Sequence, residues 1–220
     1  SAYAPASDPA KATAGLGETW QTLRLAVKPY PSCRYSHAAL DGLAALKREH
    51  GFEAGDVEEV EIGLPETGWK IIGDPEDVKH APKSVVDGQF SMPFCAAVVL
   101  REGGMVWDDY AKHIEDPETL DLCKRVKSVV DARAEAEFPA NLSGVVRVKT
   151  AADTYETFVA VPKGEPDNFL SDIEFRAKFD GLAAPYLSEA GAERLAGALL
   201  ALEQSNSIRT ITALAQPNVD

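Results

Sequence analysis

The chain has 220 residues, of which 45% are hydrophobic and 26% charged, a balance typical of globular proteins and not of disordered, collagen-like or coiled-coil chains. Its 22 Lys and Arg residues stand against 35 Asp and Glu residues, a net charge of -13 that argues against non-specific binding to nucleic acid or anionic membranes. An anionic substrate would need basic groups gathered at one place. The three cysteines show no paired spacing, the apolar runs are short and the first residues lack a secretory pattern, so we expect a cytoplasmic protein without a disulfide framework.

The first half of the chain alternates helix and strand signals. Residues 1–17 are rich in Ala, Pro, Ser and Gly, which predicts a linker or loose lead-in. Ser36 is a candidate N-cap for a helix that Gly51 ends, because leucines recur between them at helical spacing. The alternation in 57–64 predicts a half-buried strand, and 65–83 has the composition of a long irregular connection.

The second half changes from helix to strand and back. Ser91, a proline in the first turn and two terminal glycines predict an apolar core helix over 91–104, which holds Cys95. The remaining predictions are a polar helix near 117–127, strands at 128–138, 144–150 and 154–162 with a tight hairpin at 151–153, and helices starting at Ser171, Ser188 and Ile208. This irregular order indicates the α+β class, divided into a lead-in (1–17), an α+β domain (18–165) and C-terminal helices (166–220).

One segment, 28–41, combines groups that could act on an anion. Two prolines stiffen a loop that leads into a helix N-terminus, where free backbone N–H groups favour an anion. Lys28, Arg34 and His37 add basic groups there, and Asp41 is four residues after His37, a spacing at which it could orient the imidazole. Cys33, next to Arg34 and the helix start, could be an activated thiolate.

Each of these residues also has a purely structural interpretation. Lys28 could be a surface lysine, His37 a donor to the backbone and Cys33 a small packed side chain. Cys33 and His37 lack a second ligand pair, so no metal site is expected. The other three histidines, His50, His80 and His113, lie at a helix end or in polar stretches and are expected to be exposed.

Three motifs together resemble the MmgE/PrpD family. They are K-x-Y-P-x-C-x-x-x-H-x-x-x-D from Lys28, D-x-Q-F-S-x-P-F from Asp87 to Phe94, and AKFDGLAAP at 177–185. The resemblance runs from about residue 18 to 215. It implies that the chain matches the second half of such proteins, an α+β domain followed by helices that complete a larger helical domain. The chain would then be a fragment, a subunit paired with a separate N-terminal half, or a stand-alone module, and the resemblance implies a homodimer or such a pairing.

The family resemblance implies a site without cofactor or metal. Lys28 matches the lysine expected to bind a substrate carboxylate, and His37 matches a recurrent histidine at the helix start. Cys33 stands where the decarboxylase subgroup has a histidine, and Phe94 where it has a tyrosine. The candidate site is therefore His37 and Lys28 as catalytic residues, with Lys28, Arg34 and Cys33 as substrate-binding residues.

The resulting hypothesis is the substrate-binding half of a lyase for small di- or tricarboxylates. It would dehydrate a 2-hydroxy tricarboxylate, as 2-methylcitrate dehydratase does, by removing a proton next to a carboxylate. One alternative is an isomerase resembling iminodisuccinate epimerase, which begins with the same proton removal. Another is a non-catalytic binding or assembly subunit.

Overall fold

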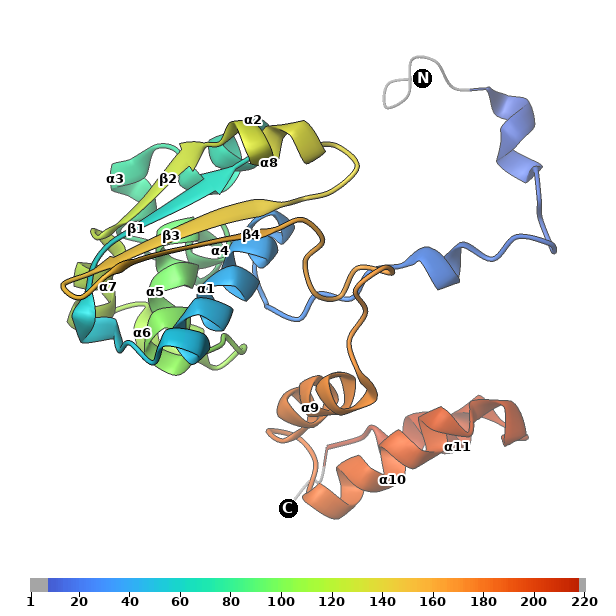
Figure 1. Ribbon diagram of the computed structural model, residues 1–220. Helices are drawn as coiled ribbons and strands as arrows, with labels where there is room; N and C mark the ends of the chain where they lie inside the picture. The colour runs from blue at the N-terminus through green and yellow to red at the C-terminus, as the bar shows by residue number, and fades with distance from the viewer. Residues whose placement is uncertain (1–7, 218–220) are drawn as a thin grey trace.

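The computed structural model describes residues 8–217, which form an α+β body, an N-terminal segment and a C-terminal group of helices (Figure 1). The strands are β1 (Val57–Leu64), β2 (Val126–Val130), β3 (Gly144–Thr150) and β4 (Thr154–Val159). The α-helices are α1 (His37–His50), α2 (Glu66–Gly68), α3 (Glu76–Lys79), α4 (Val85–Gln89), α5 (Met92–Glu102), α6 (Asp109–His113), α7 (Pro117–Cys123), α8 (Ala132–Glu137), α9 (Asp172–Ala183), α10 (Glu189–Leu200) and α11 (Ile208–Leu214).

The four strands form one mixed sheet in the order β2-β1-β3-β4. β1 pairs parallel with β2 and antiparallel with β3, and β3 pairs antiparallel with β4 across the predicted hairpin. The alternation predicted for β1 is confirmed, since Val60 and Ile62 are fully buried while Glu59 is exposed. The fold class predicted from the element order is therefore confirmed.

Helices α1 and α5 form the core with the sheet. α1 lies against β3 and β4, and α5 lies beside α1 and α7 (Figure 1). The predicted burial of α5 is confirmed: Cys95, Val98 and Val99 are fully buried, and Ser91 caps the helix by accepting a hydrogen bond from the Phe94 N–H. Gly42 lets α1 approach the sheet closely, because a Cβ there would lie only 2.9 Å from Thr157 Cγ2.

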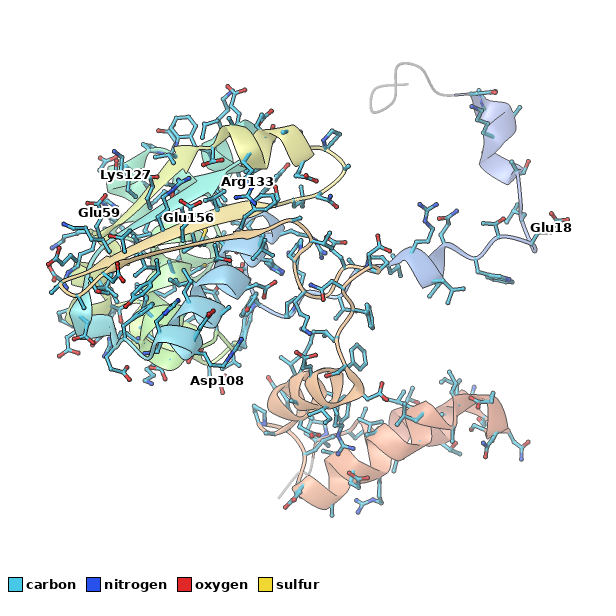
Figure 2. All side chains as sticks on the ribbon, viewed as in Figure 1. Glu18, Glu59, Asp108, Lys127, Arg133 and Glu156 are labelled. Atoms are coloured by element: carbon cyan, nitrogen blue, oxygen red, sulfur yellow. The ribbon has the colours of Figure 1, made fainter. Side chains whose placement is uncertain are left out.

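The opposite face of the sheet is covered at one end by α8 and charged elsewhere. Figure 2 shows Glu59, Lys127 and Glu156 on this face. Arg147, on β3, makes ion pairs with Glu61, Asp131 and Glu156. A sheet with one face in solvent needs such polar side chains on that face, so solvation explains the charges here.

Three parts of the secondary structure differ from the prediction. The strand expected over 128–138 ends at Val130, because the Asp131 carboxylate accepts backbone N–H bonds and starts α8 in an Ala- and Glu-rich run. The helix expected over 117–127 ends at Cys123, before β2 begins. The connection at 65–83 is not irregular throughout but contains α2, a π-helical turn (Trp69–Gly73) and α3.

Two of the histidines expected at the surface are wholly or largely buried. His113 is fully buried and contacts Thr119 Oγ1 at 2.8 Å and Glu102 Oε1 at 3.0 Å. His80 is partly buried, with Nε2 3.0 Å from the Val126 carbonyl oxygen. Only His50, at the end of α1, is exposed as expected, and its ring stacks on Tyr155. The polar sequence around residues 80 and 113 predicted exposure to solvent, but both rings have polar contacts inside the fold that replace those with water.

The two ends of the described chain lie outside the sheet body. Residues 8–26 extend from it with 3₁₀ helices at Pro9–Thr13 and Gln21–Arg24 (Figure 1). Most of the predicted lead-in is thus described, although residues 1–7 lie outside the described residues. The three predicted C-terminal helices are confirmed as α9, α10 and α11, and the Ser171–Glu174 capping box forms as expected. The domain boundaries at 18 and 166 stay predictions. None of the helices within 8–217 is long and apolar enough to cross a bilayer.

Candidate functional site

Two predicted site residues, Lys28 and His37, meet at one backbone carbonyl. Lys28 Nζ donates a hydrogen bond to the Ser32 carbonyl oxygen at 3.1 Å, and His37 Nε2 lies 3.4 Å from the same oxygen. The loop at 28–36, called the lysine loop from here on, folds back through a 3₁₀ turn (Arg34–Ser36) directly before α1. The structure therefore brings these two residues together as the spacing predicted, around a carbonyl group and not around an open helix end.

The start of α1 is closed. The His37 N–H donates to the Arg34 carbonyl, and Ser36 is buried. Ser36 occupies the N-cap position, but its hydroxyl does not cap α1 as expected; it donates to the Cys33 carbonyl at 2.7 Å instead. An anion cannot reach the free N–H groups that the sequence suggested, because the preceding turn covers them.

His37 is a neutral, fully buried imidazole. Burial is the main reason that its pKa falls to about 3; the Arg34, Lys28 and Lys178 cations add to this effect, and the contact with the Ser32 carbonyl opposes it. Its Nδ1 has no hydrogen-bond partner among the described residues. An imidazole in this state can accept or donate a hydrogen bond but is a weak base at neutral pH.

Asp41 does not orient His37, contrary to the expectation from their spacing. Its carboxylate accepts the Tyr30 hydroxyl at 2.8 Å and the Lys163 backbone N–H at 2.6 Å. Burial raises the pKa of Asp41 despite these hydrogen bonds. Asp41 thus connects the lysine loop, α1 and the segment that follows β4.

The other two predicted substrate-binding residues have protein partners. Arg34 forms an ion pair with Glu165. Cys33 is partly buried against the hydrophobic core, and its N–H donates to the Gln89 carbonyl at 2.8 Å. Cys33 therefore has the packed position that the sequence left open beside its functional role, and Arg34 has a partner within the protein.

The second sequence motif holds the first. Gln89 Nε2 and the Tyr110 hydroxyl both donate to the Pro31 carbonyl oxygen, at 3.2 and 2.8 Å. Phe94 is fully buried and stacks on Tyr110 with ring centroids 5.8 Å apart. Gln89 was part of a quoted motif, whereas Tyr110, 79 residues from Pro31, carried no sequence signal for this contact.

A charged cleft of about 590 Å³ adjoins the lysine loop and separates α1 from α9. Its basic lining residues are Arg48, Lys163 and Lys178, and its acidic ones are Asp41 and Glu174. A smaller pocket of about 180 Å³ continues between Pro29, Trp107 and α9. The third motif enters here through Ala177 and Lys178, so the second motif, through Gln89, and the third both lie next to the loop of the first.

The structure thus combines an α+β sheet domain and C-terminal helices with a lysine loop that Gln89 and Tyr110 hold beside a cleft. Residues 30–204 match the MmgE/PrpD C-terminal domain. The chain belongs to the MmgE/PrpD family.

A curated relative extends this comparison. The chain is 26% identical over 223 residues to a cis-aconitate decarboxylase-like protein of Aspergillus oryzae. The match covers 96% of this chain but 44% of the relative, so the chain spans less than half the length of that protein.

Proposed function

We propose that this chain is the substrate-binding half of an MmgE/PrpD-type lyase for small polycarboxylates, in which Lys28 binds a substrate carboxylate. The observation that carries the proposal is that segments of the second and third motifs lie next to the lysine loop of the first. Lys28 is exposed and, within residues 8–217, its Nζ has only a backbone carbonyl as partner, so a carboxylate can replace that contact with a charge-assisted one. In a chain of net charge -13, this local group of cations would concentrate an anion.

The proposed reaction is dehydration of a 2-hydroxy tricarboxylate. Cations that neutralise the carboxylates acidify the neighbouring C–H bond, and removal of that proton leads to loss of the hydroxyl as water. The proton-transfer role of His37 stays a prediction. Its low pKa makes it a weak base, so we first assign it the task of fixing the Ser32 carbonyl and, through it, the resting position of Lys28.

Epimerisation is the closest alternative, since it shares the proton removal. Decarboxylation is what the name of the A. oryzae relative suggests, but the chain has Cys33 and Phe94 at the positions where we expect a histidine and a tyrosine in that subgroup. Phe94 is fully buried and offers no hydroxyl. The proposal therefore keeps dehydration first.

A non-catalytic assembly subunit is the second candidate, because exposed apolar surface is what such a subunit requires. Both ends of the described chain carry large apolar side chains in solvent, such as Leu23, Ile173 and Leu200, each more than four-fifths exposed. Apolar surface of this extent marks an interface with another polypeptide segment. A binding subunit and a catalytic half would share this feature, so carboxylate binding separates them.

The test is calorimetric titration with citrate of the unmodified chain and of Lys28→Ala, with Lys127→Ala on the far sheet face as the control. A charge-assisted hydrogen bond contributes about 1.5–3 kcal/mol, so Lys28→Ala should weaken citrate binding by roughly ten-fold or more without lowering the melting temperature. Lys127→Ala should bind as the unmodified chain does. Equal citrate affinity in all three proteins would contradict the proposal.

A further inference from the structure

We propose that Lys178, on α9, is a second anchor of the site and binds another carboxylate of the polycarboxylate held by Lys28. This inference rests on the proposed function and deepens it. Its starting point is which of the cations around the lysine loop already have an ion-pair partner. Arg34 is paired with Glu165, and Lys163 with Glu174 at 3.1 Å, so neither is free for a ligand.

Two of the cations in the cleft lining, Arg48 and Lys178, have no carboxylate partner within residues 8–217. Arg48 is exposed and lines the large cleft but not the smaller pocket, whereas Lys178 is half-buried and lines both. Solvent and salt screen a half-buried charge less than an exposed one. Lys178 is therefore the stronger candidate for a shared ligand.

Lys178 is close to the lysine loop by two independent measures. It lines both the large cleft and the smaller pocket, each time together with Pro29, the residue that follows Lys28. The positive charges of Lys28 and Lys178 both lower the pKa of His37, in keeping with that placement. A ligand bound there would thus have one cation from the loop and one from α9.

The walls of the smaller pocket fit the carbon skeleton of such a ligand. Pro29, Trp107 and Leu182 supply apolar surface beside Lys178. Asp108 is the one acidic residue of this lining, and it lies on the side of the body that faces the C-terminal helices (Figure 2). Because Asp108 would repel a carboxylate, the anionic groups should point towards Lys28 and Lys178 and the skeleton towards the indole.

The arrangement assigns a function to the third motif. In the AKF of 177–179, Lys178 is half-buried and makes no hydrogen bond or ion pair with any residue that the structure describes. A lysine that stabilised α9 would be expected to pair with one of the acidic residues of that helix, as Arg176 does with Asp180. A free cation at a cleft wall is instead available to a ligand.

The experiment titrates the unmodified chain, Lys178→Gln, Lys28→Gln and the control Lys127→Gln with citrate, and with 3-hydroxybutyrate as a monocarboxylate, followed by NMR at millimolar concentration. We expect Lys178→Gln to weaken citrate binding about ten-fold and to leave 3-hydroxybutyrate binding unchanged, because a single carboxylate needs only Lys28. Lys28→Gln should weaken both ligands. Thermal melts should be the same for Lys178→Gln and the control.

Three outcomes would overturn the inference, and they separate it from the proposed function. If Lys28→Gln weakens citrate and Lys178→Gln behaves as Lys127→Gln, the inference is wrong while the proposed function stands. If Lys178→Gln weakens citrate and the monocarboxylate equally, Lys178 is a general electrostatic contributor and not a second anchor. If citrate does not bind the unmodified chain at millimolar concentration, both the inference and the proposed function are wrong.

Discussion

The buried His37 should make the stability of this domain depend on pH in a predictable direction. Its pKa is about 3 in the folded chain and about 6.5 when unfolded, so the unfolded state binds the proton more readily. His37 therefore does not lower the free energy of unfolding at pH values above about 6.5, the pKa of the unfolded imidazole. Stability is lost as the pH falls from about 6.5 towards 3, where the folded chain would have to bury an imidazolium.

The expected size follows from these two pKa values. Between about pH 7.5 and pH 5.5 the unfolded imidazole becomes mostly protonated while the folded one stays neutral. The unfolding equilibrium constant rises about tenfold as a result, so the free energy of unfolding falls by roughly 1.4 kcal/mol. His37→Gln removes the titrating group and keeps a hydrogen-bonding side chain. Its stability should fall by about 1.4 kcal/mol less than that of the unmodified chain over the same pH interval.

Urea unfolding curves at the two pH values measure this difference. His50→Gln is the matched control, because His50 lies at the other end of the same helix and is exposed. His80 and His113 are present in every variant, so their contributions cancel in the comparison. If His37→Gln and His50→Gln lose stability by the same amount on acidification, the burial of His37 does not have the energetic consequence argued here.

Two further predictions concern the segment after β4 and the exposed ends. Gly164 has a φ of +88° and a Cβ there would come within 1.9 Å of the Val27 carbonyl oxygen, so Gly164→Ala should displace the lysine loop. It should lower Tm by several degrees, from about 2 kcal/mol of strain and lost hydrogen bonding, and should weaken citrate binding, whereas Gly197→Ala, in open space on α10, should do neither. Unchanged citrate binding in Gly164→Ala would show that this contact does not position Lys28. The exposed apolar side chains at both ends should cause self-association at micromolar concentration, and Leu23→Ser with Leu200→Ser should reduce it; a monomeric unmodified chain by light scattering would refute this.

Much of the fold could be predicted because local signals agreed with the tertiary structure. Ser91 and its glycine stop define α5, and the alternation from Glu59 to Ile62 defines the buried face of β1. The prediction was wrong at 128–138, where alternating Ala with charged residues fits a strand as well as a short helix. There the Asp131 cap decides, and its effect is visible only when its oxygen is seen to accept the Arg133 and Ala134 N–H groups.

The candidate site was less predictable, because its contacts join residues far apart in the chain. The i, i+4 spacing of His37 and Asp41 allowed a contact, yet Asp41 binds Lys163, 122 residues away, since burial of the carboxylate demands strong donors. Arg34 likewise finds Glu165 at a separation of 131 residues. Spacing along one helix lists the possible partners, but the groups that approach from other elements decide which one is used.

These long-range contacts share one segment, residues 163–165, which links the parts of the candidate site. Residues 163–165 contact Asp41 through the Lys163 N–H, Val27 through the Gly164 carbonyl at 2.8 Å, and Arg34 through Glu165. The same segment leads to α9, which carries Lys178, and Lys163 also pairs with Glu174 on α9. A shift of this segment would therefore move the Lys28 loop and the Lys178 helix together. Because residues 163–165 contact the loop of Lys28 and lead to the helix of Lys178, a few hydrogen bonds and ion pairs set the distance between the two lysines. A ligand that bridges the two lysines would in turn stabilise this segment.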